Sequence, residues 1–163
     1  MHTITVLLAD DHAVIREGVL SLLKHEDGIQ VVGQAENGRQ AVSAAGLLRP
    51  DVVVLDISMP QLNGMEAARQ ILQASPATRV IILSAHHDAA FIALVRAIGA
   101  SGFLNKHSSA HQLPAAIRAV HQGHSFFLSP SLSDEDGHES HPGISAQQPM
   151  APSKPWRFPS SVA

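Results

Sequence analysis

Residues 51–56 read DVVVLD, and residues 79–84 read RVIILS. Each stretch places four consecutive large aliphatic residues between two polar ones. A strand with one face in water would alternate apolar and polar residues, so these stretches predict strands that are covered on both faces. Apolar residues at helical spacing occupy the segments between such stretches. The pattern therefore favours a parallel sheet with helices on both sides.

The sequence on either side continues this alternation through residue 126. Further strands are expected at 4–9, 29–35 and 102–105, and helices at 39–48, 65–72, 91–98 and 113–121. The first helix is expected near residues 14–23, where two rows at a spacing of four predict one buried face: Val14, Gly18 and Leu22, then Ile15, Val19 and Leu23. We expect one α/β domain over residues 1–126.

The composition changes near residue 127. The last 35 residues hold six of the ten prolines and eight serines, without apolar periodicity. Such a segment buries too little apolar surface to offset the entropy of ordering it. We expect residues 127–163 to be a Pro/Ser-rich linker and a disordered tail.

Composition excludes several classes of function. There is no cysteine, which rules out thiolate metal sites and thiol nucleophiles. The net charge is -3, and only Lys154 and Arg157 are basic after residue 128, so direct DNA binding is not expected from this chain. No apolar run approaches the ~20 residues that span a bilayer, and no signal peptide is evident. We expect a cytoplasmic protein without a membrane partner.

Polar residues follow four of the expected strands. The first ends at Asp10 and Asp11, the third at Asp56, the fourth at Ser84 and the fifth at Lys106. In an open parallel sheet, ligands bind outside the carboxyl ends of the strands. Carboxylates gathered there repel one another unless a cation holds them ionised. Mg²⁺ suits such a set because it prefers oxygen ligands and keeps several waters.

An aspartate beside this ion can attack phosphorus, with Lys106 pairing and Ser84 hydrogen-bonding to phosphoryl oxygens. Taken singly, each residue has a simpler explanation. Asp10, Asp11 or Ser84 could cap a helix, Asp56 could stabilise a turn, and Lys106 could be a solvated charge. Zinc is the competing metal, because His107 and His111 would share a face if their segment were helical.

Four stretches closely resemble the receiver domain of bacterial two-component response regulators: LLADDH (7–12), VVVLDISMPQLNGMEA (52–67), VIILSAH (80–86) and GASGFLNK (99–106). The resemblance covers residues 3 to about 124. It implies a flavodoxin-like fold with a five-stranded parallel sheet in the order 2-1-3-4-5 and helices on both faces. GHSFFLSPSL (123–132) also resembles the linker of the NarL/FixJ type.

The resemblance also implies roles for individual residues. Asp56 is the expected phosphoacceptor, and the expected Mg²⁺ ligands are Asp10, Asp11, Asp56 and the backbone carbonyl of Ser58. A histidine kinase or phosphotransfer protein would supply the phosphoryl group. A haloacid-dehalogenase-type phosphatase is disfavoured, because that family has a second aspartate where Ser58 stands. We therefore expect a regulator, not an enzyme.

Ser84 and Lys106 stand at the positions of the family's switch Ser/Thr and lysine, and Phe103 replaces the usual switch tyrosine. Gly64 is expected to give a tight turn its backbone freedom. On phosphorylation, Ser84 would move towards the phosphoryl group and Phe103 would fill the space that it leaves. A protein-binding face built from residues 91–98, 102–105 and 113–121 would then rearrange, and this face could also form a homodimer. Two alternatives are a pseudo-receiver binding module and a truncated or frameshifted relative of a DNA-binding regulator, since residues 129–163 lack a helix-turn-helix pattern.

Overall fold

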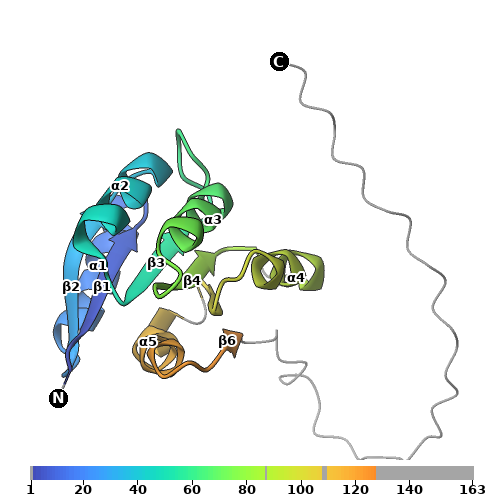
Figure 1. Ribbon diagram of the computed structural model, residues 1–163. Coiled ribbons are helices and arrows are strands. Elements are labelled where there is room, and N and C mark those ends of the chain that lie inside the picture. Colours follow the sequence, from blue (N-terminus) through green and yellow to red (C-terminus); the bar gives the residue numbers. More distant parts are fainter. Residues whose placement is uncertain (1, 87, 108–109, 128–163) are drawn as a thin grey trace, which may run out of the picture. The chain divides into compact units, whose positions relative to one another are not determined.

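The computed structural model describes residues 2–86, 88–107 and 110–127. They form a parallel sheet in the order β2-β1-β3-β4-β5-β6, flanked by helices (Figure 1). The strands are β1 Ile4–Ala9, β2 Ile29–Ala35, β3 Val52–Asp56, β4 Arg79–Ser84, β5 Gly102–Asn105 and β6 Phe126–Phe127. The helices are α1 Ala13–Lys24, α2 Gly38–Leu48, α3 Gly64–Ala74, α4 Ala89–Ala97 and α5 Leu113–His121, with a 3-10 turn at Ala110–Gln112.

The central strands are covered on both faces, as their aliphatic sequences predict. Every residue of β3 is buried, and successive side chains point to opposite faces. Val52 and Val54 pack with residues of α1 and α5. Val53 and Leu55 pack with residues of α2, α3 and α4. The sheet therefore divides the hydrophobic core into two layers, which confirms the predicted flavodoxin-like fold.

Three helices begin at residues whose side chains cap them. Asn37, Asn63 and Asp88 precede α2, α3 and α4, and each accepts a hydrogen bond from a backbone N–H in the first turn. These bonds satisfy donors that have no partner inside the helix. Each cap fixes the residue at which its helix begins, after the loop at the carboxyl end of the preceding strand.

The sheet has one strand more than the five we predicted. β6 lies parallel to β5, with Phe127 opposite Phe103. The guanidinium of Arg96 on α4 lies 3.9 Å from the centre of the Phe127 ring. Two residues are too few to show the alternation of a strand in the sequence. β6 forms because it pairs with the edge of β5, which no other strand in the described residues covers. Apart from Phe127, the predicted tail lies outside the described residues.

One prediction about the first helix is wrong. Val19 and Leu23 of α1 are buried, whereas Val14 is 82% exposed. Adjacent residues of a helix point about 100° apart, so the row that begins at Val14 points away from the row of Val19 and Leu23, which meets the sheet. In the part of the chain that is described, no helix is long and apolar enough to cross a membrane.

Candidate functional site

The fold brings the three predicted aspartates together. Asp10 follows β1, and Asp56 ends β3, the neighbouring strand in which Leu55 lies opposite Ala9. The side chains of Asp10 and Asp56 are 2% and 3% exposed, and that of Asp11 is 29% exposed. The grouping expected at the carboxyl ends of the strands is therefore present.

Lys106 extends from the end of β5 between the two buried carboxylates. Its Nζ lies 2.9 Å from Asp10 Oδ2 and 3.0 Å from Asp56 Oδ2. Burial alone would lower the pKa of Lys106, but the two carboxylates raise it. Burial raises the pKa of Asp56, and the charge of Asp10 adds to this, while Lys106 and the Ser58 N–H act in the opposite direction. One ammonium group thus serves two buried acids.

This arrangement fits Mg²⁺. Asp10 Oδ2 and Asp56 Oδ2 are buried atoms without a hydrogen bond of good geometry, although each lies close to Lys106 Nζ as an ion pair. Ligand atoms of Asp10, Asp11, His12 and Asp56 all lie within 4.8 Å of one another. Buried carboxylate oxygens that lack hydrogen bonds, beside an exposed third carboxylate, match the hard oxygen ligands that Mg²⁺ prefers.

His12 also belongs to this cluster, and we did not single it out in the sequence. Its Nδ1 lies 3.0 Å from Asp11 Oδ1, 3.3 Å from Asp10 Oδ1 and 3.9 Å from Asp56 Oδ2. The ring is more than half exposed, so it lies over the carboxylates from the solvent side. Its place directly after two aspartates is the signal that could have identified it.

Arg16 is a second residue near the site that we did not predict from the sequence. Its Nη1 donates a hydrogen bond to the backbone carbonyl of Asp10 at 2.7 Å, and its Nε donates to Gln34 at 3.1 Å. These bonds connect α1 to the loop that carries Asp10 and to the end of β2. Arg16 lies one helical turn after His12, which places both residues near the loop.

Ser84 is the buried last residue of β4, next to β3 in the sheet. Its Oγ accepts a hydrogen bond from the His86 N–H at 3.0 Å, and its carbonyl accepts one from the Lys106 N–H at 2.9 Å. The capping alternatives are wrong. The N-cap of α1 is His12, which makes no side-chain cap bond, and that of α4 is Asp88.

Phe103 lies in the interior, in the layer formed with α3 and α4. Its side chain is buried, and its ring meets that of Phe91 edge to face at a centroid distance of 5.9 Å. The Phe91 ring in turn meets the His86 ring edge to face, with the two ring centroids 6.4 Å apart. We expected Phe103 to move inward on phosphorylation, but in this structure it already occupies an inward position.

Gly64 is required for a different reason from the one we expected. It does not have a positive φ, whereas Gln61 in the same loop has a φ of 67°. A Cβ on Gly64 would lie 2.2 Å from the backbone oxygen of Asp56 and 2.7 Å from Ile57 Cα. Gly64 therefore allows α3 to begin directly against the backbone of Asp56.

The zinc alternative finds no support at His107 and His111. Lys106 and His107 form a turn, and His111 lies in the 3-10 turn, so the pair does not share a face of one α-helix. Within the described ranges, neither histidine joins a group of three metal-ligating side chains.

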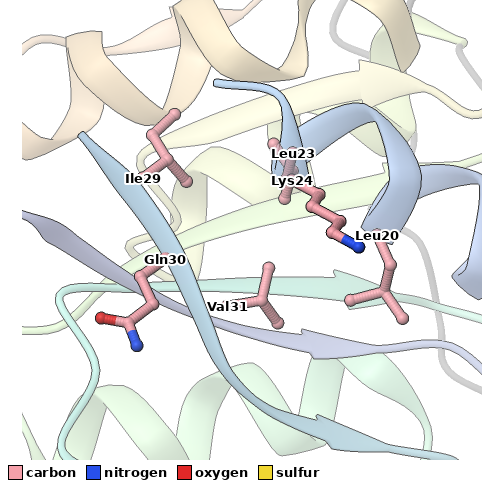
Figure 2. Close-up of a pocket in the computed structure, with 6 residues that line it drawn as sticks. All are labelled: Leu20, Leu23, Lys24, Ile29, Gln30 and Val31. Atoms are coloured by element: carbon pink, nitrogen blue, oxygen red, sulfur yellow. The ribbon is translucent and has the colours of Figure 1, made fainter. Parts of the chain in front are cut away.

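A hollow of about 360 Å³ lies between α1 and β2 (Figure 2). Leu20, Leu23, Ile29 and Val31 supply most of its lining. Ile29 pairs with Ile4 at the amino end of β1, whereas Asp10 follows the carboxyl end of that strand. Lys24 and Gln30 supply the polar part of the lining, and the hollow thus lies at the other end of β1 from the acidic site.

Comparison with known proteins supports the resemblance to receiver domains. The family described as "Response regulator receiver domain" matches residues 6–118. The transcriptional regulatory protein DegU of Brevibacillus brevis is 40% identical over 120 residues, covering 74% of this chain and 51% of DegU. The response regulator UvrY of Escherichia coli is 37% identical over 126 residues, covering 77% of this chain and 58% of UvrY. The chain thus spans between half and three fifths of the length of these relatives.

Solved structures agree with this assignment. A two-component response regulator of the LuxR family from Aurantimonas superposes with a TM-score of 0.74 at 35% identity, covering 78% of this chain and 91% of that one. The signal receiver domain of NarL from Mycobacterium tuberculosis superposes with a TM-score of 0.71 at 32% identity. The match covers 76% of this chain and 99% of the NarL domain. With its acidic site at the carboxyl ends of β1 and β3, this chain belongs to the response regulator receiver domains of two-component systems.

Proposed function

We propose that the chain works as a switch in which Asp56 accepts a phosphoryl group from a histidine kinase or a phosphotransfer protein. The observation that carries this proposal is the Asp56 carboxylate, which is buried beside Asp10 while its Oδ2 lies 3.0 Å from Lys106 Nζ. Such a group is costly to keep ionised, and a bound cation would relieve that cost.

Mg²⁺ would be held by Asp10, Asp11, Asp56 and the Ser58 carbonyl, and would shield the approach of a carboxylate to anionic phosphorus. An Asp56 oxygen then forms a bond to phosphorus while the phosphorus–nitrogen bond of the donor phosphohistidine breaks. The electron pair of that bond stays on the donor imidazole, which takes up a proton. Lys106, already directed at Asp56, pairs with a phosphoryl oxygen.

Ser84 is suited to report the change. Its Oγ accepts a hydrogen bond from His86, so its hydroxyl proton is free to be donated to a phosphoryl oxygen. Because Phe103 is already buried against Phe91, the rearrangement begins with Ser84 and the segment before α4. The face formed by α4, α5 and the edge of the sheet, where β6 covers β5, then binds another protein, including a second copy of this chain.

The test is incubation with acetyl phosphate and Mg²⁺, followed by intact-mass measurement. The wild type should gain one phosphoryl group, whereas Asp56→Asn or removal of Mg²⁺ should abolish the gain. Asp27→Asn, which changes an exposed aspartate at the far end of α1, is the matched control and should behave as the wild type. No gain in the wild type would reject phosphorylation and favour the pseudo-receiver. A gain in Asp56→Asn would place the acceptor elsewhere.

A further inference from the structure

A second group of metal-ligating side chains lies at the opposite end of the sheet from the acidic site. His2 and Asp51 stand before β1 and β3, two neighbouring strands, and His121 is the last residue of α5. One ligand atom from each of these residues lies within 4.8 Å of the others. Segments far apart in the sequence thus bring two imidazoles and a carboxylate to one place.

His2 already contacts both other members of the group. His2 Nε2 lies 3.1 Å from Asp51 Oδ2. The rings of His2 and His121 stack with centroids 5.6 Å apart and planes inclined by 12°. His2 is 68% exposed, so its ring can reorient without disturbing the core.

Asp51, in contrast, is held firmly. Its Oδ2 accepts hydrogen bonds from the N–H and the hydroxyl of Thr5, at 2.9 and 3.1 Å. Thr5 Oγ1 in turn accepts a hydrogen bond from the Asp51 N–H at 3.0 Å. No described residue donates a hydrogen bond to Asp51 Oδ1, which leaves that oxygen available to a cation. Partners that orient a ligand in this way are typical of protein metal sites.

We propose that His2, Asp51 and His121 form a binding site for a divalent transition-metal ion of the zinc type. Two imidazoles and one carboxylate are a ligand set that zinc accepts, with water completing a tetrahedron, whereas Mg²⁺ prefers oxygen alone. The carboxyl end of α5 also carries the partial negative charge of the helix, which attracts a cation. Ligand atoms around a tetrahedral zinc lie about 3.3 Å apart, so the exposed His2 closes the remaining gap.

The bound ion would connect the start of β1 to the end of α5. It shares no residue with the acidic site, so its test does not depend on phosphorylation. The primary experiment is titration of the full chain with Zn²⁺ in competition with a chromophoric chelator. His121→Ala should raise the Kd by at least about ten-fold. His25→Ala, which removes an exposed histidine outside the group, should leave the Kd unchanged.

A second measurement locates the ion. Zn²⁺ should shift the imidazole ¹⁵N resonances of both His2 and His121 in the wild type, and it should raise the melting temperature of the wild type but not of His121→Ala. Equal Zn²⁺ affinity for the wild type and His121→Ala would overturn the proposal, even if other histidines retained an ion. A loss of binding in Asp56→Asn alone would overturn it as well.

Discussion

Lys106 Nζ lies between the carboxylates of Asp10 and Asp56, and one ammonium group balances only one of these two charges. Burial and the charge of Asp10 therefore leave the pKa of Asp56 above 3.8, its ordinary value. The site is thus destabilising in the absence of a bound cation. Residues positioned for chemistry commonly reduce the stability of a protein in this way.

Asp56→Asn should consequently stabilise the Mg²⁺-free protein by roughly 1–2 kcal/mol at neutral pH. The folded wild type holds a proton that the unfolded chain has released, so wild-type stability falls as pH rises from 3.8 through the higher folded pKa. The advantage of Asp56→Asn should grow over that window. Urea unfolding at several pH values measures it, and added Mg²⁺ should stabilise the wild type more than Asp56→Asn. A destabilised Asp56→Asn would contradict this account.

His12 gives a second prediction at this scale. Its Nδ1 lies 3.0 Å from Asp11 Oδ1 and within 4 Å of an oxygen of Asp10 and of Asp56, so its ring fills space that Mg²⁺ and its waters would need. We expect His12→Ala to tighten Mg²⁺ binding several-fold, measured by isothermal titration calorimetry. His25→Ala is the control. Weaker binding in His12→Ala would instead show that the imidazole supports the ion.

At the scale of elements, the loop between β3 and α3 determines where Asp56 can lie. Gly64 N–H donates to the Ile57 carbonyl at 2.9 Å, and Leu62 N–H donates to that of Pro60 at 2.8 Å. These bonds fold the loop tightly over the end of β3. The first turn of α3 therefore packs against the backbone of Asp56 itself.

Gly64→Ala should destabilise the protein by about 2 kcal/mol or more, because the new Cβ would lie 2.2 Å from the Asp56 carbonyl oxygen, a backbone atom that cannot easily move. Gly46→Ala is the matched control. Gly46 lies in α2 with nothing within 4 Å of a Cβ, so this change should stabilise by about 0.5–1 kcal/mol. Thermal unfolding compares the two. Gly64→Ala should also slow phosphorylation by acetyl phosphate, and unchanged stability would show that the loop can relax.

At the scale of the whole molecule, the two core layers share the same strands. Ile117 of α5 is fully buried in one layer, whereas Val53 and Leu55 of β3 face the other. Since β3 contributes side chains to both layers, loss of packing on one face should weaken the sheet as a unit.

Ile117→Ala should lower the free energy of unfolding by about 2–4 kcal/mol. Leu47→Ala, at a position that is 85% exposed, should change it by less than about 0.5 kcal/mol. Circular dichroism should show one cooperative transition. The free energy of opening obtained from hydrogen exchange of the β3 amides should fall by the same amount as the free energy of unfolding. Unaltered protection of β3 in Ile117→Ala would mean that the layers unfold independently.

The sequence alone was sufficient for the βα alternation, the doubly covered sheet and the positions of Asp10, Asp11, Asp56, Ser84 and Lys106. Local patterns determine these features, because buried strands need continuous aliphatic residues and a parallel sheet brings its strand ends to one edge. Beyond this, family resemblance supplied the strand order.

Tertiary structure alone decided the rest. It placed His12 over the carboxylates, paired Phe127 with Phe103 in a sixth strand, and turned Val14 to solvent. It also brought His2 to His121 across 119 positions of the chain. No local pattern encodes such contacts, because they depend on which surfaces meet after the chain has packed.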